Sequence, residues 1–440
     1  MIASCPIKNK YILMKKIILF LLISSSAWAQ QTKNNKYNYN DFNLLVKVEN
    51  KEKYYQEMLR AKPEGKAKVA QYNEYRGSLA IGWLAKGNLE RYQYYTNNGP
   101  EFSFPNLVDF TYALEYLVED SKNLRLVEEV SKGYLDRLDK AKTKDELTLD
   151  RMQVILEVNA MANAKLGNVA IAMKNIARSS TIEGMREAKY FRDSKSNYLN
   201  RYGIVLAAAG QDKKALDLLT EAVRTADSNP RLVATLREVY RKVKGNENGL
   251  DDLIKSLQNE AYQKYYKEVE KLYIADSKIP FQGTIPDPND KAKMIPILTA
   301  KQHAKDVSLI DLNGKTVNFA DYKGKIMVID FWTTGCTPCV AAFAGFEKVV
   351  ADYKKDEFQL FVVNLFEEQP TVKSFIAKKG ISLDVLRDEP NKAYDIQATP
   401  TKIVFDPLGN IRFYGVGYAG STDREYYKLK AMVELIKANS

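Results

Sequence analysis

Two cysteines separated by two residues, Cys336-Thr337-Pro338-Cys339, are the residues of this chain whose types and spacing can do chemistry. They follow an apolar run, Ile326 to Trp332, that predicts a buried strand. A helix beginning at Cys336 would place its unpaired N–H groups under that sulfur and favour the thiolate, the nucleophile of disulfide exchange. Cys339, one turn further along, could then attack the mixed disulfide and release the product. The spacing predicts a redox-active Cys336–Cys339 disulfide that needs no other cofactor.

Two other uses of this pair remain as alternatives. A zinc ribbon needs a second pair of ligands, and the rest of the chain offers only Cys5 and His303. We therefore predict no metal site. The other alternative is a purely structural disulfide.

The first 29 residues have the pattern of a secretory signal peptide. Lys15-Lys16 precedes an apolar run that is too short to span a bilayer, and Ala27-Trp28-Ala29 provides a cleavage site. Residues 1–13 could be an upstream extension of the gene model, since Met14 makes a natural start. Cleavage would remove Cys5 and leave only the C-x-x-C pair, which in an exported protein indicates chemistry. We expect a periplasmic or otherwise exported protein of a bacterial cell envelope, with no stable membrane insertion after cleavage.

The charge of the chain argues against a nucleic-acid partner. The formal net charge is +11, and the four lysines of the leader account for part of it. The remaining excess is spread over the first part of the mature chain and forms no compact basic block. About 410 mature residues suggest two or three domains.

Residues 30–279 predict a helical region built from helix pairs. Apolar helical segments are followed by a short stretch in which glycine precedes asparagine or glutamine, and this stretch would form the turn into a second helix. The glycines are Gly87, Gly167, Gly210 and Gly245. This pattern resembles a degenerate tetratricopeptide array, whose stacked repeats leave a curved surface. The alternative is an irregular helical bundle with no ligand groove.

The best repeat unit spans residues 197–229. Gly203, Ala215 and Ala222 provide small side chains for close helix contact, and we expect Pro230 to end the second helix. Tyrosines crowd the first repeats between residues 37 and 95, where they would either form a partner surface or pack between helices.

Residues 280–295 contain several prolines and predict a linker, and residues 296–440 predict an α/β domain. A hairpin containing Asn313-Gly314 opens this domain. Strands are expected at 325–331, 359–365, 401–406 and 411–416, and helices at 337–355, 370–379 and 422–438.

Residues 300–440 resemble the TlpA/ResA-like branch of the thioredoxin family, whose members are exported. The resemblance covers about a third of the chain. It rests on four motifs: Asn313-Gly314-Lys315, Asp321-Tyr322-Lys323-Gly324-Lys325, Asp330-Phe331-Trp332 ahead of the cysteines, and Ala398-Thr399-Pro400-Thr401. The predicted fold class is multidomain, with an all-α, repeat-like amino-terminal region followed by an α/β thioredoxin-like domain.

The resemblance implies a role for each site residue. Cys336 corresponds to the attacking cysteine and Cys339 to the resolving one. Pro400 corresponds to the family's cis-proline, beside which the Thr399 backbone would pair with an extended substrate segment. Asp330 corresponds to a buried acid whose raised pKa lets it take the proton from Cys339. Trp332 would support the active-site loop by packing, and with Thr399 and Pro400 it is assigned to the substrate-binding residues. As alternatives, Pro400 would be an ordinary turn proline and Asp330 a local hydrogen-bonding group.

Three positions depart from the family pattern. Gly335 stands where thioredoxins commonly have a tryptophan, which makes the substrate-facing ridge smaller. Ala342 and Ala344 stand where exported members often have a glutamate and a proline. Asp330 is then the only local candidate for the acid.

The sequence thus predicts an exported thiol-disulfide oxidoreductase that acts on protein disulfide or dithiol substrates. The reductase direction is favoured and would need an extracytoplasmic thiol electron donor. One alternative is a helical binding scaffold with an accessory redox domain. Another is a thiol peroxidase, although we find no Thr/Ser-x-x-Cys loop with a nearby arginine around Cys336.

Overall fold

The computed structural model describes most of the chain beyond its first 36 residues. The described residues are 37–61, 67–97, 101–140, 146–182, 193–275, 283–287, 290–297 and 306–440. The predicted signal peptide lies outside these ranges. Within them, no helix combines the length and the apolar character needed to cross a lipid bilayer.

The amino-terminal part of the chain is helical, as predicted. Its helices are α2 (Tyr39–Leu44), α3 (Val48–Arg60), α4 (Ala67–Ala85), α5 (Leu89–Thr96), α6 (Phe104–Glu119), α7 (Leu124–Lys140), α8 (Glu146–Lys165), α9 (Val169–Thr181), α10 (Ser194–Ala208), α11 (Asp212–Arg224), α12 (Pro230–Lys244) and α13 (Leu250–Glu270).

The recurring glycines end helices α4, α8, α10 and α12. Each has a positive φ, between +72° and +84°, which glycine adopts without the cost that other residues incur. After three of them the next N–H bonds back to the last turn, for example from Asn168 to the Asn163 oxygen at 2.8 Å. The prediction of helix–turn–helix units is confirmed at these four turns, while the likeness to tetratricopeptide repeats stays a prediction.

The unit formed by α10 and α11 shows why small residues were needed. A Cβ added to Gly203 would lie 2.9 Å from the Leu219 side chain of α11, and Ala215 and Ala222 are buried in the same contact. The prediction for Pro230 was wrong. Helix α11 already ends at Arg224, and Pro230 begins α12, because its fixed φ and missing N–H suit the first turn of a helix.

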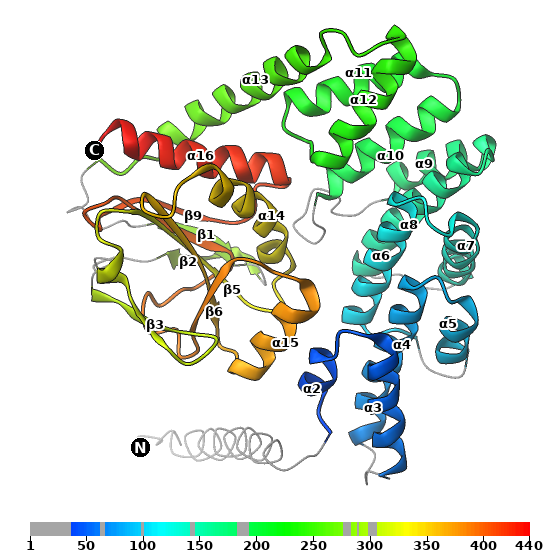
Figure 1. Cartoon of the computed structure of the whole chain (residues 1–440), viewed down its shortest axis with the longest axis horizontal. Helices are drawn as coiled ribbons and strands as arrows, with labels where there is room; N and C mark the ends of the chain where they lie inside the picture. The colour runs from blue at the N-terminus through cyan, green and yellow to red at the C-terminus, as the bar shows by residue number, and fades with distance from the viewer. Residues whose placement is uncertain are drawn as a thin grey trace, which may run out of the picture.

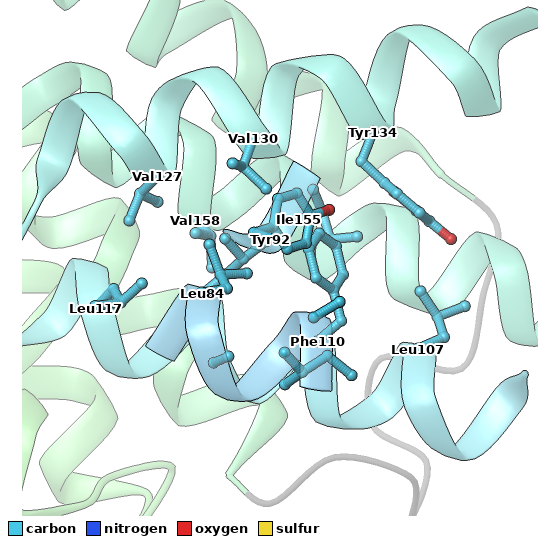
Figure 2. Close-up of a cluster of buried hydrophobic side chains, with 14 of the residues drawn as sticks. Leu84, Tyr92, Leu107, Phe110, Leu117, Val127, Val130, Tyr134, Ile155 and Val158 are labelled. Carbon is cyan, nitrogen blue, oxygen red and sulfur yellow. The ribbon is translucent and has the colours of Figure 1, made fainter. Parts of the chain in front are cut away.

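Most of the early tyrosines pack inside the helical region. Tyr55, Tyr75, Tyr92 and Tyr95 are buried in one apolar cluster formed by α2 to α8, whereas Tyr94 is largely exposed. Figure 2 shows part of this cluster, in which Tyr92, Phe110 and Tyr134 meet with aliphatic side chains between the helices. These residues therefore serve mainly to hold the helices together.

The carboxy-terminal part is a seven-stranded mixed sheet whose α-helices pack against one face. The strands are β3 (Ser308–Asp311), β4 (Thr316–Asn318), β5 (Ile326–Trp332), β6 (Phe358–Leu365), β7 (Asp384–Asp388), β8 (Thr401–Phe405) and β9 (Ile411–Val416), in the spatial order β4-β3-β7-β6-β5-β8-β9. The helices are α14 (Thr337–Asp352), α15 (Gln369–Lys379) and α16 (Thr422–Ala438), and η2 (Phe319–Tyr322) is a 3₁₀ turn.

Strand β5 is buried along its whole length because it pairs with parallel β6 on one side and antiparallel β8 on the other. One apolar cluster, which includes residues of α14, α15 and α16, covers one face of the sheet, and a second cluster around η2 covers the other. The predicted fold class, a helical region followed by a thioredoxin-like α/β domain, is confirmed.

The two parts of the chain are joined by more than a simple linker. Strands β1 (Gly283–Asp287) and β2 (Asp290–Ile297) form an antiparallel pair within and just beyond the segment predicted as a linker. Helix α13 lies against α16, and Val269 near its end belongs to the core that also contains Cys339. The last helix of the amino-terminal region thus helps to cover the carboxy-terminal sheet.

The helical region forms an arc beside the sheet domain and touches it at two places (Figure 1). At one end α2 lies beside α15, and at the other α13 lies beside α16. Polar contacts reinforce the second place, where Asp193 accepts a hydrogen bond from the Thr422 hydroxyl at 2.7 Å and Ser228 donates one to Asp423 at 2.5 Å.

Candidate active site

Cys336 and Cys339 form a disulfide at the amino-terminal end of α14, with their Cα atoms 5.4 Å apart. Cys336 is the N-cap residue of the helix, and its carbonyl oxygen accepts the first helical hydrogen bonds from Cys339 and Val340. Cys336 is half-buried, whereas Cys339 is completely buried. The sulfur at the helix end is therefore the one that a substrate can reach.

The loop before Cys336 is held by a residue that the sequence analysis did not single out, Glu367. Its carboxylate accepts hydrogen bonds from the Thr334 backbone N–H at 2.8 Å and from the Asn364 side chain at 2.6 Å. The Thr334 hydroxyl donates to it as well. An acidic residue two positions after β6 was the available signal, because the ends of the parallel strands β5 and β6 meet at the same edge of the sheet.

Trp332 lies at the end of β5 and is completely buried. Its ring packs against Phe343 of α14 and Phe375 of α15, with centroid distances of 5.4 and 5.6 Å. It supports the loop from inside, as expected, but it presents no surface to a substrate. Its assignment as a substrate-binding residue is therefore corrected to a packing role.

Thr399 and Pro400 lie at the same edge of the sheet as the cysteines. In the pairing of β5 with β8, Thr401 is opposite Phe331, which places Pro400 level with Trp332 where the active-site turn begins. The Thr399–Pro400 peptide bond is cis, as the resemblance implied. Pro400 is buried and its carbonyl accepts a hydrogen bond from Gly417 at 2.9 Å, while Thr399 is half-buried.

Asp330 is buried beneath the active site, with 1% of its surface exposed. Burial is the largest influence and raises its pKa to about 8; Lys402 lowers the pKa and Glu425 raises it further. One carboxylate oxygen, Oδ1, has no hydrogen-bond partner among the described residues. At neutral pH this carboxyl group is therefore mostly protonated.

Lys402 and Glu425 add two buried charges that the sequence analysis missed. Lys402 of β8 forms an ion pair with Glu425 of α16, and Glu425 also accepts a hydrogen bond from the Ala419 N–H at 2.9 Å. Gly345 of α14 permits this approach, since a Cβ there would lie 2.7 Å from the Glu425 Cβ. Glu425 is thus a second buried carboxyl group close enough to influence Asp330, and it could not be found from the sequence because no spacing connects it with the cysteines. That Asp330 is the acid of the site stays a prediction.

Phe366 is a further residue at this edge that the sequence did not reveal. It follows β6, is largely exposed, and has a φ of +63°, which is unfavourable for a residue with a Cβ. The parallel register brings Asn364 opposite Trp332, so Phe366 lies near the level of Thr334. An exposed aromatic side chain is thus available near the active-site loop, on the neighbouring strand end.

The peroxidase pattern is partly present. Thr333 stands three residues before Cys336, so the Thr-x-x-Cys spacing exists, contrary to the sequence interpretation. Arg387 donates to the Glu367 backbone oxygen at 3.5 Å and pairs with Glu389, and no contact links it to Cys336 among the described residues. In the same ranges, no group of three or more His, Cys, Asp or Glu side chains could hold a metal ion.

Comparisons with known proteins agree with this site. Residues 300–414 match the model of the AhpC/TSA family. The chain is 30% identical over 141 residues to the thiol-disulfide oxidoreductase ResA of Halalkalibacterium halodurans, a match that covers 31% of this chain and 77% of that protein. It is also 30% identical over 111 residues to ResA of Bacillus subtilis, covering 24% of this chain and 62% of that protein.

Among solved structures, the thioredoxin domain of a thiol-disulfide oxidoreductase from Bacteroides vulgatus is 25% identical. The match covers 29% of this chain and 92% of that chain, with a TM-score of 0.25. Each of these matches covers less than a third of the chain. Through its carboxy-terminal domain, this chain belongs to the ResA-like thiol-disulfide oxidoreductases of the thioredoxin fold.

Proposed function

We propose that this protein is an exported thiol-disulfide oxidoreductase that reduces disulfides in partner proteins. The observation that carries the proposal is the pair of sulfurs at the start of α14, one half-buried at the helix end and the other fully buried behind it. The ResA relatives support the reaction class. The proposal goes beyond the reaction class in three points: that electrons pass to the substrate, that the substrates are partner proteins, and that the protein is exported.

In the reduced protein, Cys336 would be the nucleophile. The N–H groups and dipole of α14 stabilise its thiolate. The thiolate attacks one sulfur of the substrate disulfide, forms a mixed disulfide and releases the first substrate thiolate. The Cys339 thiol then attacks the Cys336 sulfur, which releases the second substrate thiolate and forms the Cys336–Cys339 disulfide. Two electrons pass from the protein dithiol to the substrate.

Asp330 would accept the proton that Cys339 loses as it attacks. The carboxyl must be ionised to accept this proton, and its pKa of about 8 makes that form a minority at neutral pH. The resolving step should therefore become faster as the pH rises toward 8. An extracytoplasmic thiol donor must then reduce the Cys336–Cys339 disulfide for another cycle.

Thr399 and Pro400 would contact the substrate on one side of the cysteines. The Thr399 backbone would pair with an extended segment of the substrate, in the manner of strand addition. Trp332 would contribute only by packing under the loop.

An insulin-reduction assay tests the proposed reaction. The mature protein, kept reduced by a small thiol, should accelerate the reduction of insulin disulfides, and both Cys336→Ser and Cys339→Ser should abolish the acceleration. If the wild type and both variants behave alike, the reductase proposal is wrong. If the wild type instead consumes hydrogen peroxide faster than it reduces insulin, the peroxidase alternative takes its place.

Amino-terminal sequencing of the protein from a bacterial host tests export. The proposal expects a chain that begins at Gln30 and is recovered from the periplasm. A functional protein that retains Met1 or Met14 would contradict it.

A further inference from the structure

A cavity of about 380 Å³ lies between the helical region and the active-site loop. On one side it is lined by Thr334, Gly335 and Thr337, the residues directly around Cys336, together with residues of α15. On the other side it is lined by residues of α2, α4 and α6. Its lining includes neither Thr399 nor Pro400, so the cavity lies apart from the substrate contact proposed at the cis-proline.

Gly335 keeps the cavity open next to the reactive sulfur. This residue is exposed, and a Cβ added to it would meet no atom within 4 Å. The smaller ridge expected from this glycine is therefore matched by free space between the loop and the helices. A ligand group in the cavity would lie next to Gly335, the residue directly before Cys336.

The helical wall of the cavity is fixed to the redox domain. Asp109 of α6 accepts from Lys378 at 2.5 Å and from Lys379 at 2.6 Å, both on α15. Asn40 of α2 donates to the Thr371 hydroxyl at 3.3 Å. These contacts hold α2 and α6 at a defined distance from the active-site loop, so the cavity is preformed and a ligand need not assemble it.

The lining is mostly apolar, with Val108, Val340 and Phe375 in its walls, and neutral amides and hydroxyls interrupt it; its charges balance. The two lysines are balanced largely by Asp109, and Glu74 accepts a hydrogen bond from Asn106 at 3.1 Å. Asn43 is nine-tenths buried, and its Oδ1 has no hydrogen-bond partner among the described residues. A buried acceptor without a partner is costly, so a turn of the Asn43 side chain that brings this oxygen to a ligand N–H in the cavity would be favourable.

We propose that this cavity binds the polypeptide segment next to the cysteine of a disulfide-bonded protein substrate. Apolar side chains of the segment match the apolar walls, while its main-chain N–H groups and neutral polar side chains match the amides and hydroxyls of the lining. A small disulfide such as cystine could react at Cys336 but would leave the cavity largely unfilled. The inference rests on the proposed disulfide exchange and makes the helical region part of the substrate site.

Single-turnover oxidation of the reduced full chain tests this inference without an electron donor. One substrate is a synthetic peptide disulfide whose cysteines are flanked by several valine, leucine, asparagine and serine residues. The other is cystine, which has no flanking segment. The loss of protein thiols gives a second-order rate constant for each substrate.

Val108→Trp, which fills the cavity from α6, should lower the rate constant for the peptide about fivefold or more and leave that for cystine within about twofold. Asn43→Leu, which removes the free acceptor at similar size, should lower the peptide rate about threefold with the same selectivity. Tyr116→Trp, at an exposed position of the same helix outside the cavity, is the matched control and should change neither rate.

An unchanged peptide rate in Val108→Trp and Asn43→Leu would overturn the inference, and so would an equal loss for peptide and cystine. A wild-type protein that reacts with neither disulfide would refute the proposed function itself, and the inference with it. A wild type that reacts with cystine but no faster with the peptide would refute only the inference.

Discussion

Asp330 and Lys402 lie directly opposite each other on the neighbouring strands β5 and β8. Cross-strand partners point to the same face of a sheet, so the lysine approaches the buried acid beneath the cysteines. Lys402, however, is ion-paired with Glu425 of α16. The positive charge is thus shared with a second carboxylate, and burial prevails in keeping Asp330 protonated at neutral pH.

This arrangement predicts how stability depends on pH. The pKa of Asp330 is about 8 in the folded protein and about 4 in the unfolded chain, so the unfolded chain releases this proton first as the pH rises. The contribution of the group to stability is present below about pH 4 and is lost as the pH rises toward 8. Asp330→Asn cannot ionise, and its advantage over the wild type should grow across this interval to about 4 kcal/mol at pH 7.

Denaturant unfolding of the full chain between pH 4 and pH 9 measures this difference. Asp356→Asn, at an exposed position, is the control and should show no comparable trend. A stability difference between Asp330→Asn and the wild type that stays flat from pH 4 to pH 8 would show that the folded pKa is not raised.

Lys402 and Glu425 should shift the pH dependence of the resolving step in opposite directions. Lys402 lowers the pKa of Asp330 and Glu425 raises it. In Glu425→Gln the rise of the resolving rate should therefore move to lower pH, and in Lys402→Met it should move to higher pH. Both variants leave one buried charge without its partner and should lose stability by about 3 kcal/mol or more.

Stopped-flow reaction of the reduced protein with a nitrobenzoate disulfide separates the two steps, because the aromatic thiolate is released once on attack by Cys336 and again on attack by Cys339. If both variants shift the second phase in the same direction, the two residues act through general disruption, and their opposing influence on Asp330 is refuted.

The contact between α6 and α15 should stabilise the protein in a pH-dependent way. Burial alone would raise the pKa of Asp109, but Lys379 and Lys378 outweigh it and hold the pKa at about 2. Its contribution is therefore present above about pH 4 and is lost as the pH falls toward 2. Asp109→Asn should cost about 2 kcal/mol at pH 7 and almost nothing below pH 2, as followed by thermal or denaturant unfolding. A cost that is the same at both pH values would contradict this ion-pair account.

Two glycines of the helical region should respond to alanine in opposite ways. Gly203→Ala places a Cβ against the Leu219 side chain and should destabilise the protein by about 1–3 kcal/mol. Gly133→Ala, within α7 and with no atom within 4 Å of the new Cβ, should stabilise it by up to about 1 kcal/mol. The difference in unfolding free energy between the two variants checks the packing of α10 on α11, and equal effects would contradict it.

The local features of this fold could be predicted because they depend on neighbouring residues. The glycine turns after α4, α8, α10 and α12 and the apolar run of β5 carry their signal in sequence. Strand β7 was missed because it is five residues long and carries charges at both ends, Asp384 and Asp388. The β1–β2 pair was missed because its strands contain Pro286 and Pro296, and we interpreted the prolines of this segment as the sign of a linker.

The site was predicted only in part, because some of its residues come together only through tertiary packing. The cysteines, Asp330 and Pro400 lie in short motifs, whereas Glu425 reaches Lys402 from a helix that follows the last strand. The cavity beside Gly335 depends on α2 and α6, more than 200 residues away in the chain. Such contacts are created by tertiary packing and leave no local spacing to recognise.

The central claim is that the Cys336 sulfur attacks the substrate disulfide, and mass spectrometry of mixed disulfides tests it most directly. Reduced Cys339→Ser and Cys336→Ser variants of the full chain are each mixed with oxidised insulin, quenched with acid and weighed. Because Cys336 lies at the end of α14 and Cys339 is buried, Cys339→Ser should accumulate a covalent complex with an insulin chain and Cys336→Ser should not. Equal complex formation by both variants, or a complex only in Cys336→Ser, would contradict the account.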